Sequence, residues 1–90
     1  MLKLNASKKF RRDYKLCLKR GYNMRLLQTI IDTLRIPESL SIKNRDHNLS
    51  GNHAGERECH IDPDWILIYR VNDDELYLIR TGTHSDLLNM

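Results

Sequence analysis

Three strand-like runs follow one another in RECHIDPDWILIYRVNDDELYLIRTGTH, residues 57–84. Apolar residues dominate the runs, and turn-forming residues separate them, with Pro63 in the first connection and Asn72-Asp73-Asp74 in the second. Because both connections are short, the pattern predicts an antiparallel meander. We expect its strands near residues 56–61, 65–72 and 75–81.

Two amphipathic helices are expected before the meander. Ser7 and Asn23 can cap their first turns with side-chain oxygens. Gly21 ends the first helix, and Ile36-Pro37 ends the second, because proline disfavours helical geometry in the residue before it. The short link predicts antiparallel neighbours, an αα-hairpin. The apolar stripes are Phe10, Tyr14, Cys17 and Leu18 in the first helix and Leu27, Ile30, Ile31 and Leu34 in the second.

The remaining segments complete the expected fold. Leu2 and Leu4 alternate with polar residues and predict a short first strand. Residues 37–55 form a long polar loop, and a last helical turn is expected near residues 83–88. The order β-α-α-β-β-β-(α) indicates a two-layer α+β fold, with the αα-hairpin on one face of a four-stranded, mainly antiparallel sheet. We expect a single domain over residues 1–90.

The composition excludes several classes of protein. With 40% hydrophobic and 30% charged residues, the chain is typical of soluble globular proteins. A domain of this size buries roughly 60–65% of its unfolded surface, too little for an enclosed cofactor cavity, so we expect no cofactor. No apolar run approaches the roughly 20 residues of a membrane span, and Met1–Asn5 lacks a secretory signal. We therefore expect a cytoplasmic protein with no membrane partner and with Cys17 and Cys59 reduced.

Charge is distributed unevenly along the chain, although the formal net charge is only +3. Residues 1–45 carry twelve Lys and Arg against three acids, a net +9. Residues 46–90 carry three Arg against nine acids, a net −6. A basic half on a small domain favours a polyanionic partner, nucleic acid first. Helix surfaces also carry Lys and Arg for solubility alone, and charge does not separate the two interpretations.

Alternation along the first meander strand separates two sets of side chains. Cys59 and Ile61 are apolar and should face the helices, so Glu58 and His60 should face away from them. The last strand is largely apolar in both sets. The side that Arg80 takes is therefore open.

Ionisable groups from separate segments border the strand ends and the long loop. If the meander brings them together, they suit RNA cleavage by the 2′-hydroxyl, which needs a base, an acid and a cation. Imidazole, with an ordinary pKa of about 6.5, serves either proton role near neutral pH. Arg80 can hold a phosphate bidentately, and Asp64 or Glu58 can orient an imidazole. The candidate groups are His47 in the loop, His60 at a strand end, Asp64 at the next strand start and His84 after the last strand.

Simpler interpretations stay open beside this one. A single histidine in a strand is more often a partly exposed structural residue, and Trp65 is more often a core aromatic. A zinc-dependent enzyme is an alternative, but no Cys-x-x-Cys or His-x₃-His spacing occurs. Cys59 and His60 are adjacent on a strand and point to opposite faces, so they cannot share one ion. We therefore expect no metal site.

Three motifs resemble one known family. DHNLSG at residues 46–51, RECHIDPDWILIY at 57–69 and RTGTH at 80–84 are similar to the YafQ-like toxins of the RelE/ParE superfamily. The β-α-α-β-β-β order agrees, so the resemblance covers nearly the whole chain. It implies a RelE-like fold and the toxin of a type II toxin–antitoxin system. It also implies a ribosome-associated, metal-independent mRNA endonuclease that is inhibited by a cognate antitoxin.

The resemblance implies active-site roles for four residues by position: His47, His60, Asp64 and His84. Glu58 and Arg80 are our additions, because an auxiliary base and a phosphate clamp both suit a catalytic face. Our hypothesis is that His47 or His60 takes the 2′-proton and that His84 donates to the 5′-oxygen, although the residues alone do not assign the acid and the base. The six candidate catalytic residues are His47, Glu58, His60, Asp64, Arg80 and His84.

Substrate contacts are expected from aromatic, apolar and basic residues. Trp65 matches a supporting aromatic residue of the family, and Leu88 lies where the family often has an aromatic residue that contacts a base or the ribosome. The cations expected to contact phosphates of mRNA or ribosomal RNA are Lys8, Lys9, Arg11, Arg12, Lys43 and Arg45.

The target of the protein does not follow from its fold. The superfamily includes ParE-like toxins that act on gyrase, so a non-catalytic gyrase-targeting toxin or an RNA-binding module is the alternative. The histidine-rich set favours phosphodiester chemistry. The antitoxin segment that covers the basic groove should be acidic or amphipathic.

Overall fold

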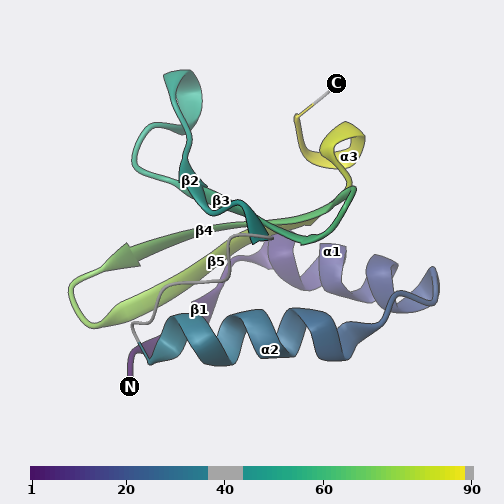
Figure 1. Ribbon diagram of the computed structural model, residues 1–90, viewed down its shortest axis with the longest axis horizontal. Helices are drawn as coiled ribbons and strands as arrows, with labels where there is room; N and C mark the ends of the chain where they lie inside the picture. Colours follow the sequence, from purple (N-terminus) through teal and green to yellow (C-terminus); the bar gives the residue numbers. More distant parts are fainter. Residues whose placement is uncertain (37–43, 89–90) are drawn as a thin grey trace.

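The computed structural model describes residues 1–36 and 44–88 of the chain (Figure 1). Two helices lie below a sheet, and a short helix near the C-terminus lies above it. None of the helices in these two ranges has the length and apolar character that crossing a bilayer requires. The elements in chain order are β1 (Lys3–Ala6), α1 (Lys8–Lys19), α2 (Met24–Arg35), β2 (His47–Asn48), the 3-10 helix η2 (Gly51–His53), β3 (Arg57–Asp62), β4 (Trp65–Asn72), β5 (Glu75–Gly82) and α3 (His84–Leu88).

The sheet has five strands in the order β1-β5-β4-β3-β2. β1 is parallel to β5 and all other neighbours are antiparallel, so the α+β class and the meander of β3, β4 and β5 are confirmed. The expected number of four strands is wrong, because β2 forms inside the segment 37–55 that we expected to be a loop. In β2, only His47 and Asn48 pair with β3. So short a strand carries no readable alternation.

Both long helices begin at the residues that the sequence predicts. Ser7 Oγ accepts the Phe10 N–H at 2.9 Å, and Asn23 Oδ1 accepts the Arg25 N–H at 3.2 Å. The Ser7 hydroxyl also donates to the carbonyl of Ile79 at 2.6 Å, which ties the start of α1 to β5. The Ser7 cap therefore fixes where α1 starts relative to the sheet.

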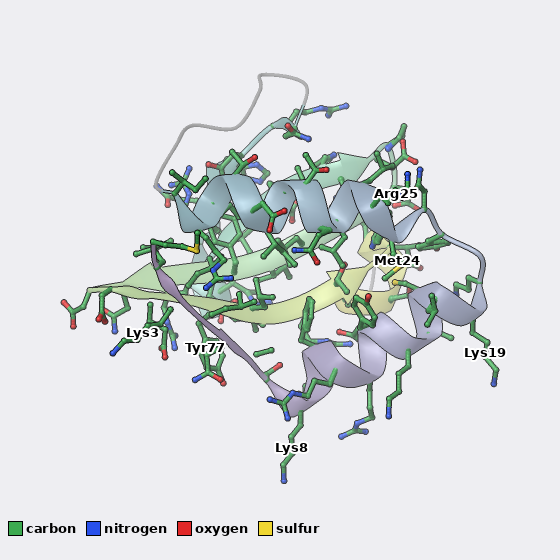
Figure 2. The ribbon with its side chains drawn as sticks, turned by 90° about the horizontal axis from the view of Figure 1, so that it is seen from below. Lys3, Lys8, Lys19, Met24, Arg25 and Tyr77 are labelled. Atoms are coloured by element: carbon green, nitrogen blue, oxygen red, sulfur yellow. The ribbon has the colours of Figure 1, made fainter. Side chains whose placement is uncertain are left out.

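The apolar core lies between the helices and the lower face of the sheet (Figure 2). Cys59 and Ile61 belong to this core, which confirms that they face the helices. Glu58 and His60 alternate with them and so lie on the opposite face. The core residues on the longer elements are Phe10 and Cys17 of α1, Leu27, Ile30, Ile31 and Leu34 of α2, Cys59 and Ile61 of β3, Trp65, Leu67 and Tyr69 of β4, and Leu76 and Leu78 of β5.

A bulge determines the side of the sheet on which Arg80 lies. Ile68 pairs with Arg80 and the next residue, Tyr69, pairs with Leu78, so Ile79 is the extra residue of β5. Leu78 lies in the core facing the helices. Arg80 shares a row with Ile68, which is buried outside that core, on the face away from the helices. Simple alternation along the sequence misses this change of side.

Replacing Ser7 by alanine should lower the free energy of unfolding by about 1–2 kcal/mol, because α1 loses its N-cap acceptor. Urea denaturation followed by circular dichroism measures the change. Ser50→Ala is the matched control, since Ser50 precedes η2 but makes no capping bond with its side chain. If the Ser7 variant were as stable as the Ser50 variant, the cap would not have the role assigned to it.

Candidate active site

Three histidines from separate segments meet above the sheet, on the face away from the helices. β2 carries His47, β3 carries His60 and α3 begins at His84. Glu58 of β3 lies directly opposite His47 in the strand pairing. The ring centroids are 6.5 Å apart for His47 and His60, and 5.2 Å apart for His60 and His84. The fold therefore brings together histidines that are distant in the sequence.

The carboxylate of Glu58 lies at the centre of this group. Its Oε1 is 3.2 Å from Nε2 of His60, 3.4 Å from Nε2 of His84 and 3.7 Å from Nε2 of His47. The Glu58 side chain is only 5% exposed. A carboxylate this buried needs hydrogen-bond donors, because an unpaired charge away from water is costly. His60 and His84 lie within hydrogen-bonding distance of Glu58 Oε1, and the His47 ring lies slightly farther from the same oxygen.

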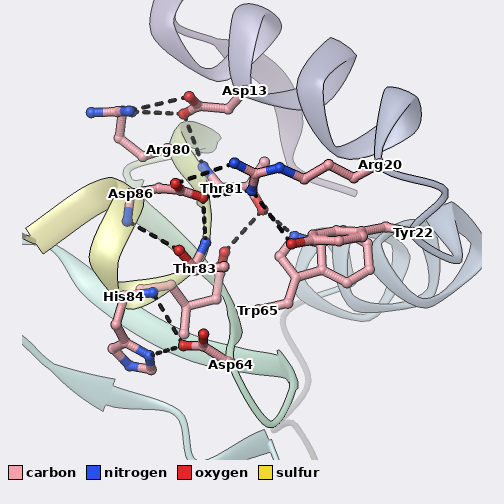
Figure 3. Close-up of polar contacts among 11 residues, drawn as sticks. Asp13, Arg20, Tyr22, Asp64, Trp65, Arg80, Thr81, Thr83, His84 and Asp86 are labelled. Atoms are coloured by element: carbon pink, nitrogen blue, oxygen red, sulfur yellow. Dashed lines mark hydrogen bonds and ion pairs between the residues drawn. The ribbon is translucent and has the colours of Figure 1, made fainter. Parts of the chain in front are cut away.

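His84 contacts a carboxylate with each of its ring nitrogens. Nδ1 lies 3.0 Å from Asp64 Oδ1 (Figure 3), and Nε2 faces Glu58. The hydrogen bond with Asp64, reinforced by Glu58 and opposed by desolvation, raises the pKa of His84 above its ordinary 6.5. The same bond, together with the backbone N–H of His84, lowers the pKa of Asp64. Both carboxylates thus favour the imidazolium form of His84, which can donate a proton.

The other two histidines differ in what their Nδ1 atoms contact. Nδ1 of His47 lies 2.7 Å from the carbonyl oxygen of Arg45, so this nitrogen carries a hydrogen. In neutral His47, Nε2 then holds a lone pair, and the side chain is 50% exposed. Nδ1 of His60 is buried with no hydrogen-bond partner in the described part of the chain. His47 is therefore better placed than His60 to accept a proton from a bound molecule.

Several contacts hold α3 so that His84 reaches the other two rings (Figure 3). Thr83 and Asp86 form a capping box, in which each backbone N–H donates to the other side chain at 3.0 Å. Arg20, just after α1, pairs with Asp86 at 2.7 Å and holds the pKa of that carboxyl low. A Cβ atom at Gly82 would lie 3.1 Å from Asp86 Oδ2. A side chain at position 82 would therefore require Asp86 and Leu87 of α3 to shift by a few tenths of an ångström.

Arg80 is held by Asp13 of α1 (Figure 3). Its Nε and Nη2 contact the two Asp13 oxygens at 2.6 and 3.1 Å, a bidentate pair. Lys9, Arg12 and Leu16 join these residues around a hollow of about 290 Å³. Among the described residues, the Arg80 guanidinium pairs with Asp13 rather than with the histidine group. Two strand spacings, roughly 10 Å in all, separate its backbone from that of Glu58.

The other expected substrate contacts lie at different places. Arg45 lines a hollow of about 340 Å³ beside His60. Trp65 is only 4% exposed, packs on Tyr22 with ring centroids 4.9 Å apart and donates to Thr81 at 2.9 Å, so it acts from inside the core. The rest are Lys8 and Arg11, which are exposed on α1, and Lys43 and the Leu88 side chain, which lie outside the described residues.

The same centre offers ligands for a metal ion. One ligand atom from each of Glu58, His60 and His84 lies within 4.8 Å of the others. One carboxylate oxygen and two imidazole nitrogens suit zinc or copper. Such an ion would occupy the nitrogens that proton transfer needs. Cys59 faces the core instead, and burial raises the pKa of its thiol to about 12.

Two carboxylates outside the expected set take part in this region. Asp13 holds Arg80, and Asp46 contacts Arg57 and Tyr69 beside the strand that carries His47. The position of Asp46 directly before His47 was the available signal for its role. No signal pointed to Asp13, because its pairing joins residues that are 67 positions apart.

A family model described as a bacterial toxin of type II toxin-antitoxin system, YafQ, matches residues 2–89 of the chain. The mRNA interferase toxin YafQ of Escherichia coli strain K12 is 41% identical over 86 residues, which cover 93% of this chain and 92% of the relative. The fold and the histidine–carboxylate centre therefore define a small α+β bacterial toxin. The chain belongs to the YafQ family of type II toxin–antitoxin systems.

Solved structures agree with this assignment. A copper-bound mutant toxin from Helicobacter pylori is 47% identical, with a TM-score of 0.94 over 97% of this chain and 99% of that chain. The YafQ-like chain matched in the E. coli DinJ-YafQ toxin-antitoxin complex is 36% identical, with a TM-score of 0.88 over 97% of this chain and 98% of that chain. The resemblance that the sequence motifs predict is thus confirmed.

Asp64→Asn should lower the pKa of His84, because an amide stabilises the imidazolium less than a carboxylate does. NMR titration of the imidazole resonances measures this shift. The raised pKa of His84 contributes stability that is present below 6.5 and lost as pH rises through the raised value. The lowered pKa of Asp64 contributes stability that is present above 3.8 and lost as pH falls through the lowered value. The Asp64→Asn variant should therefore lose most stability between pH 3.8 and pH 6.5, where both contributions are present.

Asp62→Asn is the matched control for this titration, since Asp62 is an exposed carboxylate in the same turn. It should leave the pKa of His84 unchanged. Equal effects of the two substitutions would mean that general surface charge, rather than the contact with Asp64, sets the protonation of His84.

Proposed function

We propose that this protein is the toxin of a type II toxin–antitoxin system and acts in the cytoplasm as a ribosome-associated endoribonuclease that cleaves mRNA. The main support is the convergence of three imidazoles on Glu58 Oε1, with His47 and His84 in different hydrogen-bonding environments. Family membership supports it too, as does the name of the E. coli relative, an mRNA interferase toxin. Cleavage of mRNA would inhibit translation.

The proposed reaction is a phosphoryl transfer within the RNA chain. The 2′-oxygen attacks the adjacent phosphorus, and the bond from phosphorus to the 5′-oxygen breaks. Nε2 of His47 takes the proton of the 2′-hydroxyl, and His84 gives a proton to the leaving 5′-oxygen. The products are a 2′,3′-cyclic phosphate and a 5′-hydroxyl. No step in this scheme needs a metal ion or a cofactor.

The charges around the centre support this division of roles. The lowered pKa of Asp64 makes its carboxylate a weak base, so Asp64 orients His84 rather than taking the 2′-proton. Glu58 lies near Nε2 of His47 and stabilises the imidazolium that forms there. His60 stays hydrogen-bonded to Glu58 between the two reacting rings. The carboxylate also opposes the approach of a phosphate, so nearby cations are needed.

Basic residues beside the centre would supply those cations. Asp13 occupies Nε and Nη2 of Arg80, which leaves the Nη1 donors for a phosphate oxygen. Lys9 and Arg12 line the same hollow and extend the positive surface along α1. Arg45 would contact the RNA on the other side of His60. The exposed cations Lys8 and Arg11 add salt-sensitive contacts to mRNA or ribosomal RNA.

The expected protein partner is a cognate antitoxin. An acidic or amphipathic segment of the antitoxin would cover the basic surface. Its binding to the toxin should weaken as the salt concentration rises. The E. coli relative that forms a complex with DinJ supports a partner of this kind. The alternative without catalysis, a gyrase-targeting toxin, would need none of the histidines for activity.

Replacing His47 or His84 by glutamine should slow RNA cleavage by about 10²–10⁴-fold, because each variant loses one proton-transfer group. The effect is measured as the rate at which a defined RNA is cleaved, both alone and on ribosomes. Growth arrest of cells that produce each variant gives a second measurement. The assays are run in excess chelator, where the wild type should keep its full rate.

His53→Gln is the matched control, because His53 lies on η2 and pairs with Glu56 at 3.0 Å, away from the centre. Growth arrest that survives loss of all three clustered histidines would favour the gyrase-targeting alternative. A wild-type enzyme that chelator inactivates would be metal-dependent.

Lys9→Ala should weaken binding of a non-cleavable 2′-deoxy oligonucleotide and reduce the salt dependence of binding. For single strands, the slope of log K against log salt falls by about 0.7 for each phosphate that the protein no longer neutralises. Fluorescence anisotropy at several salt concentrations measures the slope. Lys3→Ala is the matched control, since Lys3 lies on β1 and pairs with Asp74. Equal slopes for the two variants would remove the hollow beside Arg80 from the RNA path.

A further inference from the structure

The strand that carries His47 has little structure of its own. β2 contains only His47 and Asn48, and its pairing extends over just two residues of β3. Arg45 lies two residues before His47 and has a φ of 46°. This is a left-handed backbone conformation that residues other than glycine seldom adopt. Such a conformation persists only where the surrounding contacts fix it. Something beyond the two-residue ladder must therefore hold this segment.

Asp46 supplies that hold through groups on the neighbouring strands. Its Oδ1 accepts the phenol hydrogen of Tyr69 at 2.6 Å, and its Oδ2 lies 3.0 Å from Nη2 of Arg57. Arg57 also donates through Nη1 to Asn48 Oδ1 at 2.6 Å. The guanidinium thus spans both residues that flank His47. Tyr69 belongs to the core and is 1% exposed, so its hydroxyl is a fixed point.

The register puts these groups and the catalytic candidates on opposite faces of the sheet. Asn48, Arg57 and Tyr69 form one row across β2, β3 and β4. His47 and Glu58 begin the adjacent row, which faces away from the helices. Because side chains alternate, holding one row from below fixes the direction of the other row above.

We propose that Asp46, Arg57 and Tyr69 form a positioning network that fixes the His47 ring and directs its Nε2 toward the reaction centre. The inference rests on the proposed function, because it concerns the histidine that would take the 2′-proton. Arg57 and Tyr69 hold the side chain of Asp46. Asp46 follows Arg45 directly, so the same contacts fix the carbonyl of Arg45, which accepts the hydrogen bond from Nδ1 of His47. That hydrogen bond keeps the proton on Nδ1 and leaves the Nε2 lone pair free.

The electrostatics of the network agree with a permanent arrangement. Burial, and then the hydrogen bond to Asp46, raises the pKa of Tyr69, so the phenol keeps the hydrogen that it donates. The hydrogen bond with Asp46 likewise raises the pKa of Arg57. Neither donor changes its charge in the range where histidine titrates, so both keep their hydrogen bonds to Asp46 while His47 gains or loses a proton.

Tyr69→Phe tests the network, because it removes one hydroxyl and keeps the ring in the core. We expect the kcat for RNA cleavage to fall about tenfold or more, as for other small displacements of a reacting group, with little change in KM. The ¹⁵N resonances of His47 should shift toward the form with its proton on Nε2. Those of His60 and His84 should not move. Asp46→Asn should have the same effects, because an amide pairs less well with Arg57 than a carboxylate does. The variant should still fold, because the Asp46 side chain lies near the surface.

Tyr77→Phe is the matched control, because Tyr77 of β5 lies under the Arg70 guanidinium and outside the network. It should change neither the kcat nor the His47 resonances. Unchanged His47 resonances in both folded Tyr69 and Asp46 variants would overturn the inference. This outcome is distinct from a failure of the proposed function, in which the wild-type protein would not cleave RNA although the resonances of His47 still respond.

Discussion

A single buried negative charge organises the upper face of this protein. The Glu58 carboxylate is almost wholly shielded from water, and its Oε1 lies within 3.7 Å of the Nε2 atoms of three histidines, two of which are at hydrogen-bonding distance. A charge in that position is tolerated only when donors surround it. The segments that carry His47 and His84 must therefore approach β3, although each forms only a short element. His47 and His84 nevertheless differ in their hydrogen bonds, because each has a different second contact.

Those second contacts divide the centre into an accepting side and a donating side. His84 lies between two carboxylates and favours the charged form, whereas His47 gives its Nδ1 hydrogen to a backbone carbonyl. Both arrangements depend on segments that are held from elsewhere. The Arg20–Asp86 pair ties α3 to the end of α1, and Asp46 ties the β2 segment to the strands below it. The helical layer thus contributes to the centre without contributing a reacting group.

The sequence predicted the parts of this molecule that repeat over several residues. Both long helices and the three meander strands follow from apolar periodicity, and the orientation of Glu58 and His60 follows from Cys59 and Ile61. β2 was not predictable because two residues carry no period, and the bulge at Ile79 was not predictable because it interrupts one. Motif resemblance, rather than spacing, indicated that the histidines converge. The Arg80–Asp13 pair had no local signal, since packing alone brings α1 beside β5.

The way in which α1 meets β5 also affects how the molecule behaves in a crowded solution. β1 pairs with β5 only as far as Leu78, so the rest of β5 would otherwise offer a bare strand edge to other chains. Ser7 donates to the carbonyl of Ile79, and Asp13 accepts the N–H of Thr81, so side chains of α1 and its cap occupy hydrogen-bonding groups along this stretch. The contacts from α1 and its cap thereby leave fewer free hydrogen-bonding groups at this edge of the sheet, which discourages strand pairing between molecules there.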